Sequence, residues 1–548
     1  MPDGASVEVS VRPGPDGFGW RVANTSRSPV PVRSVSVVHS LRGVTGPLRL
    51  FSNGYQSWSR TGLLRPGVDR DPTAVGDLDL LMMMHHADQR EIPAGQLRSE
   101  LVTVVADDDG AVLAGFLGGD RHDGTFRLGH GRSGNELVVE AFLGDAVLAP
   151  GEERELHDVV VRPTDDPVGA LDDWAADAGE RSGARADAPY QVGWCSWYHY
   201  FETVTERDLR ANLSRAGDWP FDVFQVDDGF QAEVADWTDA AETFPSGLPA
   251  VAESIAAAGM RPGLWLAPFL VAPGSAVARV HPDWVARFPD GTPLIAGYNE
   301  HWGGLVHALD TSNPAVLDHL EHLARDLVAM GFTYLKLDFT YAPSFDGVWH
   351  DPSLTPAQRV RAGYDAIRRG AGDEAFLLGC GAPLGACIGV VDGMRIGPDV
   401  APWWEPRPEL WPYRGYEGTI PSTLNALRNT LTRAHQHRRL WINDPDCLML
   451  RTTDTELDAD QVRAWALAVA ASGGMALVSD DLALLDDDAR NLLDEVVRVG
   501  RAVDDLARSG PAPRCEDLLT TDTPTTLRAG GLRFTGDPRP GAARLSVD

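Results

Sequence analysis

The sequence predicts a multidomain α/β protein with three parts: an N-terminal antiparallel β-sandwich, a central (β/α)₈ TIM barrel and a short C-terminal β domain. Two observations predict this fold class. Apolar and polar residues alternate over residues 1–163, which is the period of half-buried strands. After residue 190, apolar strand-like runs alternate with amphipathic helical patterns, as they do in a parallel barrel.

The N-terminal part, residues 1–163, has the pattern of an antiparallel sandwich. Valine occupies every second position from Val7 to Val11, so one face of that strand is apolar. Asp107–Gly110 separates two apolar runs and is typical of a hairpin turn. Residues 164–189 contain a short helical pattern followed by an alanine-rich linker.

Residues 190–495 predict the barrel. The candidate strands are Val192–Trp197, Val223–Asp227, Gly263–Ala267, Tyr334–Asp338, Phe376–Cys380, Gly393–Ile396, Leu440–Asn443 and Met475–Ser479. Helical patterns separate most of them, and the spacing of Thr205 and Asp208 indicates a capping box at one helix start. A doubly wound sheet would need a glycine-rich turn after its first strand, and Trp194–Trp197 contains no glycine. Residues 496–548 predict a small β region.

The net charge and the cysteine content limit the possible classes of function. The formal net charge of −31 is spread along the chain, so no basic patch is available for nucleic acid or an anionic membrane, and a neutral substrate is favoured. The five cysteines are scattered and odd in number, so they predict neither a disulfide framework nor a metal site. Met1–Gly4 starts no secretion signal, and no stretch approaches a membrane span, so we expect a cytoplasmic enzyme.

The chain contains a single lysine, Lys336, among 48 basic residues. Lysine is a compact point charge, whereas arginine is a broad planar fork, so the two differ most in a tight polar pocket. In a strand, Lys336 and Asp338 point to the same face. Because Leu335, Leu337 and Phe339 flank them, the segment is predicted to be buried, with an ammonium beside a carboxylate.

Carboxylates and tryptophans gather at the predicted strand ends, where barrel enzymes carry their active sites. The ends include Trp197–His199, Asp227–Phe230, Trp265–Pro268, Lys336–Asp338, Cys380–Gly381, Arg395–Asp399, Asn443–Asp446 and Ser479–Asp481. One acidic loop is commonly a helix cap, but the same bias recurs at strand after strand. Indole faces stack on sugar C–H surfaces, and Asp and Lys bind hydroxyls, so the pattern predicts a carbohydrate site.

The chain resembles the retaining α-galactosidases of glycoside hydrolase family 36, especially the short bacterial type. The matching motifs are Phe51–Ser59, Trp194–Tyr198, Val226–Gln231, Lys336–Phe339, Gly379–Pro383, Val391–Asp399 and Asn443–Cys447. The resemblance implies a β-sandwich, a (β/α)₈ barrel and a C-terminal β domain. It also implies hydrolysis of terminal α-D-galactosyl residues of oligosaccharides through a covalent intermediate, with no cofactor and no metal.

Carried over by motif, Asp338 is the expected nucleophile and Asp399 the expected general acid/base, the two carboxyl groups that a retaining glycosidase needs. The substrate-binding residues implied by the resemblance are Asp227, Asp228, Lys336, Arg395, Trp265, Trp197, Tyr198, Cys380, Gly381 and Trp58. Lys336 keeps Asp338 ionised and binds sugar hydroxyls.

Each binding residue has an expected place. Asp227 and Asp228 accept from the 4- and 6-hydroxyls, and Arg395 contacts the 2-hydroxyl. Trp265 and Trp197 form walls, with Tyr198 near the nucleophile and Trp58 closing the rim from the sandwich. Cys380 and Gly381 face the 2-position, where a small wall separates a hydroxyl from an acetamido group.

Three weaker motifs are discounted. Gly129–Gly134 matches a dinucleotide-binding pattern but precedes a strand inside the β-rich region, where a helix would be needed. His85 and His86 are interpreted as a surface loop or domain contact and not as metal ligands. Asn443–Asp446 lacks the spacing of a calcium loop and is interpreted as structural or as a support for the residues that contact the substrate.

Rival functions remain open. An α-N-acetylgalactosaminidase or a transferase of the raffinose-synthase kind shares the expected machinery. A Schiff-base aldolase also uses a lysine on a barrel strand. An inactive carbohydrate-binding protein is disfavoured because Asp338 and Asp399 are both present. The sequence indicates no oligomeric state.

Overall fold

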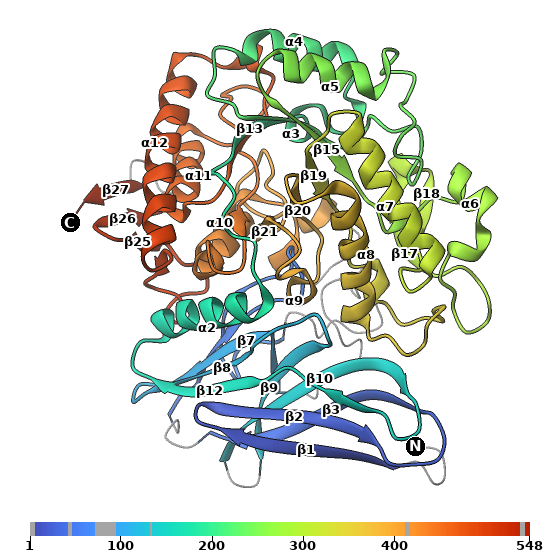
Figure 1. Cartoon of the computed structure of the whole chain (residues 1–548). Helices are drawn as coiled ribbons and strands as arrows, with labels where there is room; N and C mark the ends of the chain where they lie inside the picture. The colour runs from blue at the N-terminus through green and yellow to red at the C-terminus, as the bar shows by residue number, and fades with distance from the viewer. Residues whose placement is uncertain are drawn as a thin grey trace.

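The computed structural model describes residues 6–41, 46–71, 95–131, 134–410, 417–536 and 543–547. A β-sandwich forms one end of the molecule and a (β/α)₈ barrel the other, with helix α2 (Pro167–Ser182) between them (Figure 1). The apolar side chains of both parts belong to one continuous core. The predicted fold class is confirmed.

The sandwich consists of two antiparallel sheets. The first has the order β1 (Val7–Gly14), β2 (Gly17–Asn24), β12 (Val159–Thr164), β8 (Ala111–Phe116), β7 (Val102–Ala106), β4 (Arg49–Ser52) and β5 (Gly62–Leu64), with β11 (Glu153–Glu155) beside β2. The second has the order β3 (Val30–Ser40), β10 (Gly134–Leu148), β9 (Asp123–Gly131) and β6 (Leu97–Glu100). The predicted hairpin turn joins β7 to β8, and the Asp107 carboxylate accepts hydrogen bonds from the Asp109 and Gly110 amides.

Gly131 and Gly134 face each other across the antiparallel strands β9 and β10. The dinucleotide-like motif therefore begins and ends in a strand pair, and no helix follows it.

Eight parallel strands form the barrel, and they correspond one by one to the predicted strands. They are β13 (Val192–Cys195), β14 (Val223–Val226), β15 (Arg261–Leu266), β19 (Tyr334–Leu337), β20 (Phe376–Gly379), β21 (Gly393–Arg395), β22 (Ile442–Asp444) and β23 (Ala476–Val478). β13 pairs with both β14 and β23. Between β22 and β23 the barrel is nearly closed by the Met475 amide, which donates to the Asn443 carbonyl over 2.9 Å.

Helices surround this barrel (Figure 1). They are α3 (Trp197–Tyr200), α4 (Glu206–Ala216), α5 (Gly247–Ala257), α6 (Ala276–Val280), α7 (Pro314–Ala329), α8 (Pro356–Ala371), α9 (Leu384–Cys387), α10 (Thr423–Thr432), α11 (Ala459–Ser472) and α12 (Asp487–Ser509). The capping box predicted at Thr205 and Asp208 starts α4. Short 3₁₀ helices are η1 (Phe201–Thr203), η2 (Pro282–Trp284), η3 (Glu300–Trp302), η4 (Ala342–Ser344), η5 (Pro408–Leu410), η6 (Glu417–Thr419), η7 (Ala434–Gln436) and η8 (Leu482–Leu484).

Two small sheets complete the fold. An insertion between β15 and α7 forms the order β16 (Leu270–Val271), β18 (Gly304–Ala308) and β17 (Ile295–Asn299). The C-terminal sheet contains β24 (Arg514–Cys515), β25 (Thr526–Ala529), β26 (Leu532–Thr535) and β27 (Arg544–Val547). Because α12 spans the expected boundary at residue 495, we propose that the C-terminal β region starts after this helix.

One buried arginine joins the sandwich to the barrel. The guanidinium of Arg433 donates to the side-chain oxygen of Asn53 and to the carbonyls of Gly54, Gln56, Ser57 and Ile396. Four of these acceptors belong to the sandwich segment that carries Trp58, and Ile396 follows barrel strand β21. All five N–H donors of the side chain are therefore used, so this arginine fixes the segment at the barrel mouth.

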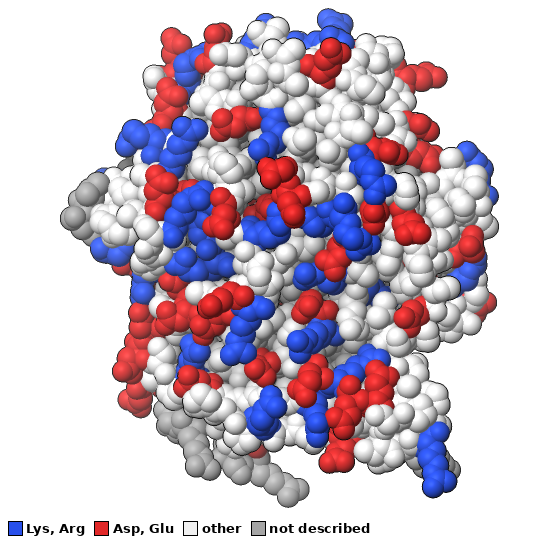
Figure 2. All heavy atoms as spheres, in the orientation of Figure 1, with Lys and Arg blue, Asp and Glu red and all other residues white. Residues whose placement is uncertain are grey.

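Basic and acidic side chains are interspersed over the face in Figure 2. In the part of the chain that the structure describes, no helix is long and apolar enough to cross a membrane.

Candidate active site

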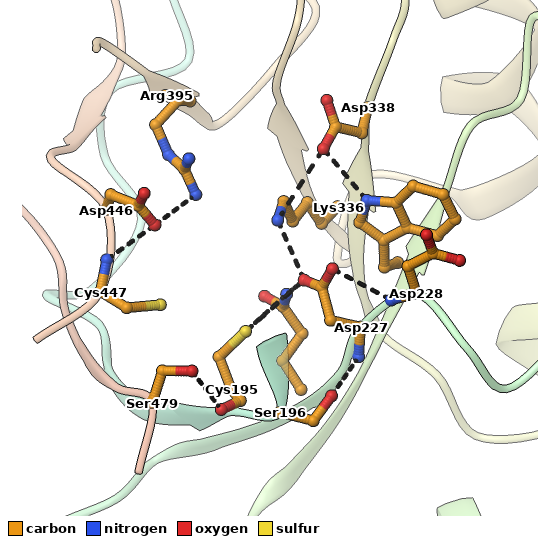
Figure 3. A network of polar contacts seen from close by, with 12 residues as sticks. Cys195, Ser196, Asp227, Asp228, Lys336, Asp338, Arg395, Asp446, Cys447 and Ser479 are labelled. Atoms are coloured by element: carbon orange, nitrogen blue, oxygen red, sulfur yellow. Dashed lines mark hydrogen bonds and ion pairs between the residues drawn. The ribbon is translucent and has the colours of Figure 1, made fainter. Parts of the chain in front are cut away.

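Lys336 lies at the centre of a buried polar network at the carboxyl end of the barrel (Figure 3). Its Nζ lies 2.9 Å from Asp227 Oδ2 and 3.9 Å from Asp338 Oδ2. The side-chain alternation on β19 thus places Lys336 and Asp338 on one face, as expected, although the shorter ion pair joins Lys336 to Asp227. Burial is the largest single effect and lowers the pKa of Lys336. The charge of Asp227, together with smaller contributions that include Asp338, outweighs it and raises the pKa well above its usual value.

Asp338, directly after β19, is held by two N–H donors. Trp265 Nε1 donates to Oδ2 over 3.0 Å, and the Phe339 amide donates to Oδ1 over 2.8 Å. Phe339 has a φ of 52°, which is unusual for a large side chain. Its ring packs against Trp58 and Trp302, with centroids 5.0 Å away in both pairs. These contacts hold the strained backbone that directs the amide at Asp338.

Gly381 fits closely against this carboxylate. It has a φ of 50°, and a Cβ there would lie 2.9 Å from the Phe339 nitrogen and 3.1 Å from Asp338 Oδ1. The same Cβ would lie 2.9 Å from the Trp58 ring. Cys380 is fully buried beside it. Only glycine suits both the backbone and the space at this position.

Asp227 and Asp228 follow β14, but the protein holds them differently. Oδ2 of Asp227 accepts from Lys336, from Gln225 Nε2 at 2.5 Å and from the Cys195 thiol at 3.5 Å. Its Oδ1 accepts from the Asp228 amide at 3.0 Å. Oδ2 is thus saturated by protein donors, and Oδ1 is the oxygen left with capacity for a ligand.

Asp228 accepts from Gln231 Nε2 at 2.5 Å and from Trp302 Nε1 at 2.9 Å. Burial, opposed by these two bonds, raises its pKa to about 6. Trp302 was not among the residues expected from the sequence. It reaches the site from η3, between β17 and β18, and so depends on how that insertion folds back over the barrel.

Arg395 joins three carboxylates on the other side of the site. Its Nη1 lies 3.0 Å from Asp399 Oδ1, its Nε lies 3.1 Å from Asp444 Oδ2, and its Nη2 lies 2.7 Å from Asp446 Oδ1. The Asp399 side chain is 32% exposed, compared with 8% for Asp338. Loss of hydration raises the pKa of Asp399, although Arg395 and Lys336 oppose this effect. Asp399 thus combines a more exposed side chain than Asp338 with a raised pKa.

The hydroxyl of Tyr198 donates to Asp446 Oδ2, and Asp446 pairs with Arg395, so Tyr198 is joined to the Asp399 side of the site. Tyr198 follows β13, which neighbours β23 where the barrel closes toward β22. Its expected place near Asp338 stays a prediction. Asp446 was interpreted from the sequence as structural or as a support for the residues that contact the substrate.

The two remaining expected residues are partly buried tryptophans, Trp58 and Trp197. Trp58, from the sandwich, packs on Phe339 and lies near Tyr341. Trp197 is half-buried on α3, and its ring meets Phe201 edge-on with centroids 5.3 Å apart. No described contact joins Trp197 to the aspartates, so its role as a wall stays a prediction.

Among the described residues, no group of three or more His, Cys, Asp or Glu side chains is arranged to hold a metal ion. His85 and His86 lie outside the described residues.

Comparison with known proteins finds relatives named as alpha-galactosidases. Residues 192–342, which carry Asp227, Lys336 and Asp338, match the family model described as Melibiase. "Alpha-galactosidase 2" from Pediococcus pentosaceus is 29% identical over 166 residues, covering 29% of this chain and 22% of that protein. "Alpha-galactosidase AgaA" from Geobacillus stearothermophilus is 31% identical over 148 residues, covering 25% and 19%. The chain thus aligns with only about a fifth of the length of these curated relatives.

Solved structures match over nearly the whole chain. TtGalA, an alpha-galactosidase from Thermus thermophilus in complex with p-nitrophenyl alpha-D-galactopyranoside, superposes with a TM-score of 0.69 at 28% identity, covering 90% of this chain and 92% of that one. GH36 alpha-galactosidase AgaA from Geobacillus stearothermophilus superposes with a TM-score of 0.65 at 14% identity, covering 99% and 76%.

The chain is thus similar to the Melibiase family over residues 192–342 and, over most of its length, to the structure of an alpha-galactosidase. The proteins that match it in sequence are named alpha-galactosidases, which are glycoside hydrolases.

Proposed function

We propose that the protein is an exo-acting retaining α-galactosidase that hydrolyses terminal α-D-galactosyl residues of oligosaccharides of the melibiose and raffinose type. The observation that carries the proposal is the grouping of Asp338 and Asp399 at one barrel end, with Lys336 beside the first and Arg395 beside the second. The likeness to TtGalA, whose structures were solved with p-nitrophenyl alpha-D-galactopyranoside and with stachyose, supports an α-galactoside as substrate.

In the first step, a carboxylate oxygen of Asp338 attacks the anomeric carbon. The bond from that carbon to the leaving oxygen breaks, and its electron pair takes the proton of Asp399. Two N–H donors, of Trp265 and Phe339, bond to the Asp338 carboxylate, and the Lys336 ammonium lies 3.9 Å from it. Burial favours a protonated Asp399. The two carboxyl groups are thus suited to opposite tasks.

In the second step, Asp399 accepts a proton from water, whose oxygen attacks the anomeric carbon and releases Asp338. Two displacements at the same carbon give a product with the configuration of the substrate. We therefore expect α-galactose to form first.

The remaining polar groups define how galactose is held. We propose that Asp227 Oδ1 and Asp228 bind the 4- and 6-hydroxyls, with Lys336 between them, and that Arg395 contacts the 2-hydroxyl. The aromatic rings of Trp58, Trp197 and Trp265 supply apolar faces for the sugar. Cys380 and Gly381, in their crowded position beside Asp338, favour a 2-hydroxyl over an acetamido group.

An aldolase role for Lys336 is disfavoured by its surroundings. A Schiff-base lysine must lose its proton to attack a carbonyl group. The Asp227 carboxylate at 2.9 Å instead raises the pKa of Lys336, which keeps the ammonium charged.

Hydrolysis of an aryl α-D-galactoside tests the proposal, with the matching α-N-acetylgalactosaminide and α-glucoside alongside. NMR of the first-formed sugar reports the anomer. Release of α-galactose from the galactoside alone is expected. Turnover of the acetamido sugar would instead favour an α-N-acetylgalactosaminidase, and transfer to an added sugar acceptor in place of hydrolysis would favour a galactosyl transferase. First-formed β-galactose would overturn the role of Asp338.

The five cysteines are all buried free thiols, which fits a reducing compartment. A cytoplasmic location is therefore part of the proposal, and cell fractionation tests it.

A further inference from the structure

Asp446 lies on the loop after β22, next to the site, and it is fully buried. Its Oδ1 accepts from the Cys447 amide and from Arg395 Nη2, both at 2.7 Å. Its Oδ2 accepts from the Val400 amide at 2.9 Å and from the Tyr198 hydroxyl. Four donors from three parts of the chain therefore converge on one side chain.

Two of these donors lie on either side of Asp399 in the sequence. Val400 is the next residue, so its amide fixes the backbone immediately after Asp399. Arg395 lies four residues before Asp399 and uses Nη1 to hold Oδ1 of that carboxylate at 3.0 Å. Asp446 therefore holds both the backbone next to Asp399 and the side-chain partner of Asp399.

The backbone of Asp446 is itself strained. Its φ is 90°, a region that costs a non-glycine residue roughly 1–3 kcal/mol unless surrounding contacts impose it. The Asp446 amide donates to Asp444 Oδ1 at 3.0 Å, and Asp444 also pairs with Arg395 Nε. A purely structural aspartate would not need to face the same arginine as Asp399 does.

We propose that Asp446 is the positioning residue of the general acid/base: through Val400 and Arg395 it sets where the Asp399 carboxyl group points and how readily that group gives up its proton. The proposal rests on the role of Asp399 in the proposed function.

The charges around Asp446 determine whether it raises or lowers the pKa of Asp399. The groups that face it are Arg395, Lys336, Asp399, Asp444, Tyr198 and Cys447. Burial raises the pKa of Asp446 to about 6, with Arg395 opposing and Asp399 adding to the rise. Repulsion between two carboxylates is mutual, so the Asp446 charge also raises the pKa of Asp399. Removal of that charge lowers the pKa of Asp399, both directly and because Arg395 is left with one carboxylate fewer to neutralise.

Asp446→Asn tests the proposal because it keeps the size of the side chain. The new NH₂ group can donate to Tyr198 but cannot accept from the Val400 amide, so the backbone after Asp399 loses its anchor. For melibiose, whose leaving group needs protonation, we expect kcat/KM to fall roughly 10- to 100-fold. For 2,4-dinitrophenyl α-D-galactoside, whose leaving group does not, the change stays within about 3-fold.

The pH profile supplies the second measurement. The alkaline limb of kcat/KM for melibiose reports the acid form of Asp399 in the free enzyme. In Asp446→Asn this limb should move to lower pH by roughly half a unit to one unit. Equal loss on both substrates together with an unmoved limb would overturn the proposal, because that result describes a site damaged without regard to acid catalysis.

Two further variants keep the test decisive. Asp504→Asn removes another buried, ion-paired aspartate, which lies on α12 and accepts from Arg438 and His437. It should lower the melting temperature while the leaving-group ratio and the alkaline limb stay as in wild type. If Asp446→Asn does not fold, Tyr198→Phe is tested in its place. Loss of the hydroxyl removes a hydrogen bond to Asp446 and leaves this side chain less ionised. The kcat/KM for melibiose should then fall roughly 2- to 5-fold, and the alkaline limb should move to lower pH by a fraction of a unit. Unchanged readouts there would refute the proposal, whereas an inactive wild-type protein would refute the proposed function instead.

Discussion

Asp338 and Asp399, the two proposed catalytic carboxylates, are held in opposite ways. Asp338 is 8% exposed, accepts from two N–H groups and lies near an ammonium. Asp399 is 32% exposed, and Arg395 is its described side-chain partner. A carboxylate that is fixed by hydrogen bonds from the protein suits a nucleophile. A less constrained carboxyl group can take and release a proton. The difference in packing therefore mirrors the difference in proposed task.

Replacing the tightly held carboxylate should have the largest effect. Asp338→Ala removes the attacking group, so we expect kcat to fall by about 10⁴-fold or more. Azide fits the space left by the side chain and should partly restore turnover, giving galactosyl azide of inverted configuration. Product NMR checks this outcome. Unchanged activity without azide would show that Asp338 is not the nucleophile.

Replacing the looser carboxylate should have an effect that depends on the substrate. For Asp399→Ala we expect a loss of roughly 10²- to 10⁴-fold with melibiose and a much smaller loss with 2,4-dinitrophenyl α-D-galactoside. Steady-state kinetics over a series of aryl leaving groups measures the dependence. A uniform loss across the series would show that the two carboxylates do not divide the work in this way.

Crowding at the nucleophile predicts a smaller effect. Gly381→Ala places a Cβ 3.1 Å from Asp338 Oδ1 and adds strain at a φ of 50°. Gly183→Ala is a matched control, because Gly183 has a φ of 65° and nothing within 4 Å of the added Cβ. Both variants should lose roughly 1–2 kcal/mol of unfolding free energy in urea. Only Gly381→Ala should lose activity, by about 10-fold or more.

The smallest effect is expected from Trp302→Phe. This change keeps the ring that packs on Phe339 and removes the N–H donor to Asp228. The lost bond had lowered the pKa of Asp228, so that pKa should rise above about 6. Near pH 6 more of the side chain is then protonated, and KM should increase roughly 2- to 5-fold with little change in kcat. A KM that rises equally at pH 8 would contradict the proposed cause.

The barrel and the strand-end residues were predictable because the information is local. A buried parallel strand is a short apolar run, and the residue that follows it must stand at the barrel mouth. Lys336 and Asp338 share a face through simple alternation, and the structure confirms it. The residues around Trp302 do not indicate how the β17–β18 insertion folds over the barrel. Its contact with Asp228 was therefore not predicted.

The motif that contains Asp446 was recognised from the sequence, but its partners were not. They are Arg395 and Tyr198, which follow or lie on other strands. The pairing of Lys336 with Asp227 likewise depends on the lateral order of β14 and β19 around the barrel. Contacts of this kind are set by the closed topology, which no local pattern encodes.

The Arg433 contacts impose an order on biosynthesis. This arginine bonds to acceptors as far as 380 residues before it in the chain. Ribosomes add about 5 to 20 residues per second, so roughly 20 to 75 s pass between synthesis of the Trp58 segment and arrival of its anchor. During that interval the segment lacks the guanidinium that holds it, and catalysis must wait until most of the polypeptide has emerged.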